Sequence, residues 1–300
     1  MKKWLYNPVL VSELKIRMRG FRAALAVTLY VGIMLLIAFL YFQSSVENRL
    51  RYSAYSANQS LGIEIYALLA ILQFALILLI TPAQTAGAIS GEREKQTFDL
   101  LLCTKMTPAA IILGKLFSSL SFILLLIIGS IPLFSLVFLF GGVGPLDVLM
   151  LFVFYLVTAF GVGSIGIFCS SLFKRTVVSI VVAYVTVFAL GILTVSLGVY
   201  MLSLHYSRQM TSYVGTYIPF VLYINPAVGL ADLLSRQVGT SIGGILGFFR
   251  PGGIFGGTGG TAPNIWIINS LVILVIAIAL LLWSAWIIKP IKRTKGKSRS

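Results

Sequence analysis

The residues of this chain that could do chemistry are concentrated in one polar stretch, residues 88–115, which reads AISGEREKQTFDLLLCTKMTPAAIILGK. Three of the chain's eight acidic residues lie in it, namely Glu92, Glu94 and Asp99. Long apolar runs flank the stretch on both sides. A short segment that carries charges of both signs next to apolar side chains is suited to docking in a groove of a soluble partner.

Two motifs in the sequence partly match nucleotide-binding patterns. Gly114-Lys115 is similar to the end of a phosphate-binding loop, but Ala109 replaces the required glycine and Leu116 replaces the hydroxyl that binds magnesium. Residues 161–166 read GVGSIG, but they lie inside an apolar run and not between a strand and a helix. Because glycines at this spacing let helices pack closely in lipid, we expect a packing role there and no nucleotide site on this chain.

The other ionisable residues are too scattered to form a catalytic or metal site. His205 is the single histidine, and no cluster of ligands surrounds it in the sequence. Cys103 and Cys169 are too few for a disulfide scaffold and are interpreted as free thiols. Glu64 and Asp147 lie near the ends of apolar runs, where a charge costs less than at a membrane centre. We therefore expect no enzyme activity, no metal and no cofactor on this chain.

The composition predicts an all-α membrane protein formed by one domain over residues 1–300. Hydrophobic residues make up 58% of the chain and charged residues 10%, whereas soluble proteins carry about 25% charged residues. The apolar runs exceed the length of about 18 residues that a transmembrane helix needs. Strands of a membrane barrel would show alternation over roughly ten residues instead.

Six transmembrane helices are expected. Their predicted bounds are about 21–42, 61–87, 108–140, 146–172, 177–203 and 265–288. The polar residues 43–60 predict a loop between the first two helices. Thr107 and Pro108, an N-cap followed by proline, begin the third helix. Pro132 predicts a kink within that helix.

The positive charges predict the orientation in the membrane. Eighteen of the 23 Lys and Arg residues lie in the N-terminal segment, the 88–115 stretch, the turn at Lys174 and Arg175, or the tail 289–300. The positive-inside rule places these segments, and hence both termini, in the cytoplasm. The net charge of +15 is therefore explained by orientation in a cell membrane, and we expect no nucleic acid partner.

Residues 1–20 predict an amphipathic helix that lies in the membrane interface. Asn7 and Pro8 form a helix start, and apolar residues then recur at helical spacing among basic ones. The residues assigned to this helix are Leu10, Leu14, Arg17 and Met18. An extension of the first span with snorkelling cations is the alternative.

The external segment 204–264 predicts a pair of re-entrant or interfacial helices before the last span. Asn225 and Pro226 form another N-cap followed by proline. The residues that then form one helical stripe are Ala227, Leu230, Ala231, Leu234 and Val238. The glycine-rich residues 239–260 predict a loop.

The region 88–107 predicts a short amphipathic helix between the second and third spans. Thr97 can cap its start, and Phe98, Leu101 and Leu102 then share one face. A helix that lies on lipid headgroups is the alternative, although its polar face would then be rich in Lys and Arg. The mixed charges favour docking into a groove of a soluble partner.

This set of features resembles the ABC-2 type permeases, the membrane subunits of ATP-binding-cassette exporters. The family pattern of E-R-E-x-G-T, followed by T-P and later by G-K, is similar to residues 92–97, 107–108 and 114–115, with Gln96 in place of the glycine. The N-P-V-L at residues 7–10 and the N-P at residues 225–226 also resemble the family. The resemblance covers essentially the whole chain.

The resemblance implies a permease energised by a separate ABC ATPase, which carries the ATP and magnesium. It implies a second copy of this chain or a paralogous permease as partner, in a prokaryotic cell membrane. The residues implied to contact the ATPase through a coupling helix are Glu92, Arg93, Glu94, Thr97, Phe98, Leu101 and Leu102. A membrane channel or assembly scaffold without ATP coupling is the alternative. The sequence assigns no substrate and no substrate-binding residues.

Overall fold

The computed structural model describes residues 21–52, 57–97, 107–208, 219–238 and 264–288, and within these ranges it contains helices and turns but no strand. Six helical stretches there are long and apolar enough to cross a membrane, which confirms the six predicted spans. The helices that supply them are α2 (Phe21–Tyr52), α3 (Ala57–Thr85), α6 (Pro108–Gly129) with α7 (Ile131–Phe140), α8 (Pro145–Leu172), α9 (Thr176–Arg208) and α11 (Ile265–Ile287).

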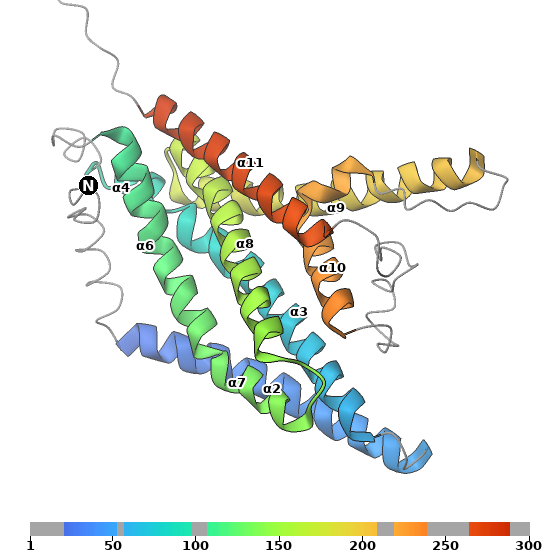
Figure 1. Ribbon diagram of the computed structural model, residues 1–300. Coiled ribbons are helices and arrows are strands. Elements are labelled where there is room, and N and C mark those ends of the chain that lie inside the picture. Colours follow the sequence, from blue (N-terminus) through green and yellow to red (C-terminus); the bar gives the residue numbers. More distant parts are fainter. Residues whose placement is uncertain (1–20, 53–56, 98–106, 209–218, 239–263, 289–300) are drawn as a thin grey trace, which may run out of the picture.

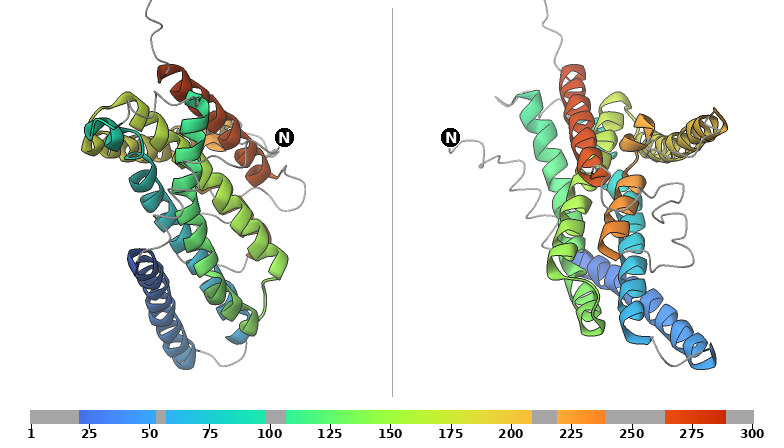
Figure 2. Two further views of the ribbon diagram at one scale, coloured as in Figure 1. Left: turned by 90° about the vertical axis from the view of Figure 1, so that its left-hand side faces the viewer. Right: turned by 45° about the vertical axis from the view of Figure 1, so that its right-hand side comes forward.

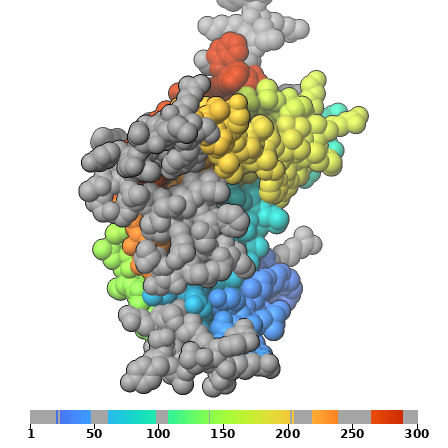
Figure 3. Space-filling view, turned by 90° about the vertical axis from the view of Figure 1, so that its right-hand side faces the viewer, coloured from blue at the N-terminus to red at the C-terminus, as the bar shows by residue number. Residues whose placement is uncertain are grey.

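Helix α8 is the centre of the bundle and packs against α3, α6, α9 and α11 (Figure 1). The short helix α4 (Ser90–Glu94) lies at one end of the bundle, together with the start of α6. Helices α2 and α9 are the least buried of the six spans, and α9 projects away from the bundle (Figure 2). Side chains of α9 lie beside those of α3 on the molecular surface (Figure 3), where the Tyr184 hydroxyl donates a hydrogen bond to the carbonyl of Leu79.

Glycines let α8 approach its neighbours closely. A Cβ atom added at Gly161 would overlap Ile273 of α11, and one added at Gly166 would overlap Thr85 of α3. Residues 161–166 lie within α8, where Gly161 packs against α11 and Gly166 packs against α3. This confirms the packing interpretation of the motif.

The third span is broken where the sequence predicts a kink. The Thr107 side chain accepts a hydrogen bond from the backbone nitrogen of Ala110 at 3.4 Å, so the predicted N-cap is confirmed. Helix α6 then ends at Gly129, and α7 starts at Ile131 with Pro132 in its first turn. Proline is tolerated in a first turn, where a backbone N–H has no helical partner.

The loop predicted over residues 43–60 is largely helical. Helix α2 continues to Tyr52 and α3 begins at Ala57. No Gly or Pro occurs in this stretch, so its polar residues can continue the helices beyond the apolar layer.

The segment before the last span contains a short 3-10 helix, η1 (Phe220–Ile224), and α10 (Pro226–Val238). The Asn225 side chain accepts a hydrogen bond from the backbone nitrogen of Ala227 at 2.9 Å, as its assignment as N-cap predicts. Leu230, Leu234 and Val238 of the predicted stripe are buried.

Helix α10 also carries a buried charge that its apolar stripe did not indicate. Asp232 accepts hydrogen bonds from Arg236 Nε, one turn later, and from the backbone nitrogen of Trp266 at 3.1 Å. The second bond joins α10 to the start of α11. The predicted interfacial helix with Leu10, Leu14, Arg17 and Met18 lies outside the described residues, as do the tail 289–300 and residues 239–263.

Candidate functional site

The junction segment, defined here as residues 86–97, follows the end of α3 and is fixed to α8 by hydrogen bonds. The Ser170 hydroxyl oxygen accepts from the backbone nitrogens of Ile89 and Ser90 at 2.9 and 2.8 Å. Ile89, Ser90 and Ser170 are buried. The first N–H groups of a helix have no partner within the helix, so one hydroxyl of α8 satisfies two donors at the start of α4.

Glu92 joins the junction segment to α6. The Lys115 ammonium group forms an ion pair with Glu92 Oε1, and the Lys115 side chain is only 7% exposed. A buried ammonium group is costly without an opposite charge or hydrogen-bond acceptors. The ion pair with Glu92 therefore explains how the apolar helix α6 can carry a buried lysine.

Arg93 joins the junction segment to the end of α8. Its Nη1 atom donates a hydrogen bond to the backbone carbonyl of Ser171 at 2.7 Å. The last carbonyls of a helix lack helical partners and form the negative end of the helix dipole. A guanidinium group is therefore well suited to this position.

Glu94 joins the junction segment to the start of α9. Its Oε2 atom accepts hydrogen bonds from the backbone nitrogen of Thr176 at 3.1 Å and from the Thr176 hydroxyl at 2.6 Å. Thr176 is the first residue of α9, where the helix dipole is positive and an N–H group needs an acceptor. Three consecutive residues thus contact three different helices, α6, α8 and α9, and we call this set of contacts the three-helix junction.

The turn after α4 has the geometry of a Schellman motif. Gln96 has φ of 59°, the left-handed region that favours glycine. The Gln96 nitrogen donates to the Arg93 carbonyl at 3.1 Å, and the Thr97 nitrogen donates to the Glu92 carbonyl at 3.0 Å. These are the two hydrogen bonds that define this type of helix end. Gln96 therefore adopts here the backbone conformation that glycine most readily provides.

Comparison with known protein families identifies this architecture. The model of a family described as ABC-2 family transporter protein matches residues 41–287, which is more than half of the chain. The chain belongs to the ABC-2 transporter family. No curated protein matches the sequence. The protein is therefore a transporter permease, that is, a multi-pass membrane component of a transport system.

The residues predicted to contact an ATPase lie partly within the described part of the permease. Glu94 and Thr97 are exposed, while Glu92 and Arg93 are half-buried and contact α6 and α8 as described above. Phe98, Leu101 and Leu102, the predicted apolar face, lie outside the described residues. Contact of these seven residues with a partner stays a prediction.

Sequence reasoning missed the residues that receive the junction segment. Ser170, Ser171 and Thr176 were not singled out, and Lys115 was noted for its similarity to a phosphate loop and to the G-K of the family pattern, not as a partner of Glu92. Their position in the sequence could have indicated this role. Ser170 and Ser171 lie at the end of one apolar run and Thr176 at the start of the next, and hydroxyl residues at such positions can bond the backbone of helix ends.

Other polar residues of the permease have structural roles. The Tyr41 hydroxyl donates to Glu64 Oε2 at 3.2 Å. Asp147 Oδ2 accepts from the backbone nitrogen of Gly144 at 2.9 Å, at the start of α8. Cys169 is a buried free thiol. Within the described ranges, no group of three His, Cys, Asp or Glu residues is placed to hold a metal ion.

Proposed function

We propose that the permease is the membrane subunit of an ATP-driven exporter, with ATP hydrolysis on a separate ABC ATPase. The observation that supports this proposal most strongly is the three-helix junction. Glu92, Arg93 and Glu94 are consecutive, so a displacement of their backbone acts at once on α6, α8 and α9. Such a segment is suited to transmit motion from a soluble partner to the membrane helices.

The contacts of the junction segment favour motion as a unit. Ser170 holds the start of α4, and Arg93 and Glu94 bond the two ends of the turn between α8 and α9. Because well-packed groups resist compression, a displacement of the junction segment is passed on to the helices that it contacts. In this proposal, the ATPase contacts Thr97, Phe98, Leu101 and Leu102, and the three-helix junction carries the movement into the bundle.

We further propose that the end of the bundle with α4 faces the cytoplasm of a prokaryotic cell, with both termini on that side. The distribution of Lys and Arg supports this orientation. ATP and magnesium would bind the ATPase, while a second copy of this chain or a paralogous permease would complete the membrane part. A channel or scaffold without ATP coupling is the second candidate, because family membership alone leaves ATP dependence open.

The experiment that tests this function is purification of the full-length permease from its native membrane, with identification of the bound proteins. We expect a protein with a phosphate loop and an ABC signature, and ATP hydrolysis by the purified complex. Replacing Phe98 and Leu102 with glutamate should remove that protein while leaving the permease folded. The control is replacement of Phe98 with Leu and Leu102 with Met, which keeps the apolar face.

Two outcomes contradict the proposal in different ways. Unchanged co-purification of the doubly charged variant would show that this face does not dock the ATPase. A permease that binds no ATPase, and that conducts or assembles without ATP, would support the channel or scaffold instead.

A further inference from the structure

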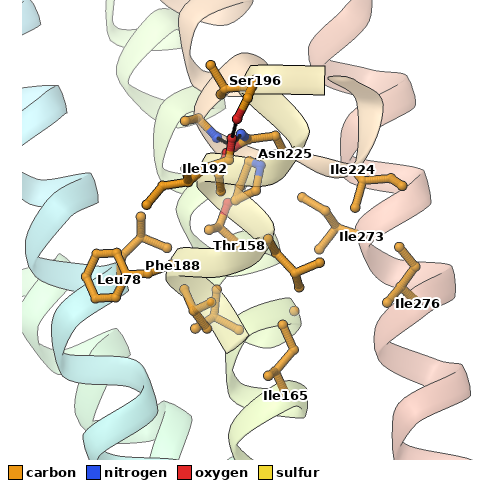
Figure 4. A pocket seen from close by; sticks show the side chains of 18 of the residues that line it. Leu78, Thr158, Ile165, Phe188, Ile192, Ser196, Ile224, Asn225, Ile273 and Ile276 are labelled. Atoms are coloured by element: carbon orange, nitrogen blue, oxygen red, sulfur yellow. Dashed lines mark hydrogen bonds between the residues drawn. The ribbon is translucent and has the colours of Figure 1, made fainter. Parts of the chain in front are cut away.

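The spans of the described region enclose an apolar cavity of about 670 Å³ (Figure 4). Its walls come mainly from α8, α9 and α11, and η1 and the start of α10 also contribute. Gly161 of α8 and Gly191 of α9 are among the residues that line it. A Cβ atom added at Gly191 would meet no atom within 4 Å, so the space beside this residue is open.

The cavity opens at the surface of the described region, beside exposed side chains of α9. Phe188, Leu190 and Ile192 of α9 line it, and their side chains are 53%, 41% and 66% exposed. They lie within a candidate membrane span, as do the lining residues of α8 and α11. The opening therefore lies at the level of the apolar layer, and a molecule that enters through it must be soluble in that layer.

The lining selects against charge. No Asp, Glu, Lys or Arg occurs among the described residues that line the cavity. An ion placed there would lose its hydration without gaining an opposite charge. Ligand sites are typically apolar cavities of about 300–1,000 Å³ with a small number of placed polar groups, and this cavity fits that description.

One polar atom in the cavity has no hydrogen-bond partner among the described residues. Thr158 lies halfway along α8, is fully buried and lines the cavity, and its Oγ1 atom is unpartnered. The Asn225 amide, by contrast, already bonds Gly191 and Thr194. Buried hydroxyl groups are almost always hydrogen-bonded, so the unpartnered Thr158 Oγ1 is the polar atom of the lining that a ligand would satisfy. Because Thr158 is fully buried, its side chain must rotate toward the cavity to form that bond.

We propose that this cavity binds a neutral, largely apolar molecule that enters from the bilayer and bonds Thr158 Oγ1 through a hydroxyl or carbonyl group. We also assign this class of molecule as the cargo, an assignment that rests on the export function proposed above. Three observations support a neutral, largely apolar ligand with one polar group. They are the absence of charged lining residues, the open space beside Gly191 and the unpartnered hydroxyl of Thr158.

Photolabelling of the full-length permease in lipid vesicles tests the site. The probes are a diazirine-bearing hexadecanol, its sulfate ester and the matching hexadecane. We expect the alcohol to label α8, α9 and α11 at cavity residues, and the charged ester to label them far less. Gly191→Phe should abolish this labelling because it fills the open space. Gly32→Phe is the matched control, since a Cβ atom added at Gly32 on α2 would also meet no atom within 4 Å.

Thr158→Val distinguishes the contribution of the hydroxyl to binding from that of the cavity shape, because valine keeps the shape of threonine and lacks its hydroxyl. Loss of one hydrogen bond should weaken labelling by the alcohol about tenfold, while labelling by hexadecane should be unchanged or stronger. Equal labelling by the sulfate ester, or alcohol labelling that Gly191→Phe leaves intact, would overturn the site.

The cargo assignment is tested with the ATPase present. We expect ATP to reduce the amount of the hexadecanol probe that stays in the vesicles. Gly191→Phe should prevent this loss. Retention of the alcohol while ATP is being hydrolysed would overturn the cargo assignment. A complex that hydrolyses no ATP would instead contradict the export function, and the labelling pattern would still decide the site.

Discussion

Lys115 of α6 and Glu92 of α4 form an ion pair across a separation of 23 residues, with the lysine side chain almost fully buried. Both belong to the motifs that resemble the ABC-2 pattern, E-R-E and G-K. The pair gives these two motifs a common physical role, which is to hold the junction segment against the third span.

Reversing one charge of this pair should destabilise the permease, and reversing both should restore it. Glu92→Lys or Lys115→Glu alone leaves like charges together below the surface, at a cost of about 3 kcal/mol. The double variant re-forms an opposite pair. Thermal unfolding of the purified protein measures the effect, and a double variant no more stable than either single one would contradict the pairing.

Ser170→Ala should destabilise the junction segment because it removes the acceptor of two buried N–H groups. Leaving a buried donor unsatisfied costs about 1–3 kcal/mol. Ser171→Ala is the matched control: its hydroxyl donates to the Phe168 carbonyl one turn back, and Arg93 bonds its backbone. We expect a lower Tm for Ser170→Ala alone, and equal Tm values for the two variants would refute the capping role of Ser170.

The sequence predicted the spans because each is a continuous apolar run, and the helix starts at Thr107 and Asn225 because capping is local. The kink near Pro132 followed for the same reason. It did not predict the helical extensions over residues 43–60, since polar composition was taken to indicate a loop although no helix-breaking residue occurs there.

The three-helix junction could not be derived from the sequence. The charges of Glu92, Arg93 and Glu94 were evident, but their partners lie 23, 78 and 82 residues away. Which helix ends meet the segment depends on how the spans pack, and apolar periodicity carries little of that information. The cavity beside Thr158 was missed because wall residues and lipid-facing residues are equally apolar.

Gln96→Gly should stabilise the permease. A non-glycine residue in the left-handed region costs about 1–2 kcal/mol, and part of that gain is offset by the greater freedom of glycine in the unfolded chain. We expect a net gain of about 1 kcal/mol in thermal unfolding. Lys95→Gly is the control, because Lys95 has φ of −82° and should lose stability. A destabilised Gln96→Gly variant would contradict the assigned turn.

Gly161→Ala and Gly166→Ala should each destabilise the bundle by about 1–3 kcal/mol, since the added methyl group overlaps Ile273 or Thr85. Gly191→Ala is the control, because its methyl group enters open space. We expect Gly191→Ala to match the unmodified protein in Tm, or to exceed it slightly as alanine favours helix. Tolerance of alanine at Gly166 would show that α8 and α3 are not in close contact.

Glu94 can act through Thr176 of α9 or through a partner subunit, and a double-mutant cycle separates these roles. If Glu94 acts by bonding the start of α9, Glu94→Ala and Thr176→Val should each reduce ATP hydrolysis by the purified complex, and the double variant should be no worse than Glu94→Ala alone. The bound ATPase should remain in all three. If Glu94 instead contacts the ATPase directly, Glu94→Ala should lower the amount of ATPase that co-purifies, while Thr176→Val should not. The hydrogen bonds of 2.6 and 3.1 Å between these two residues support the first result, in which Glu94 links the junction segment to α9.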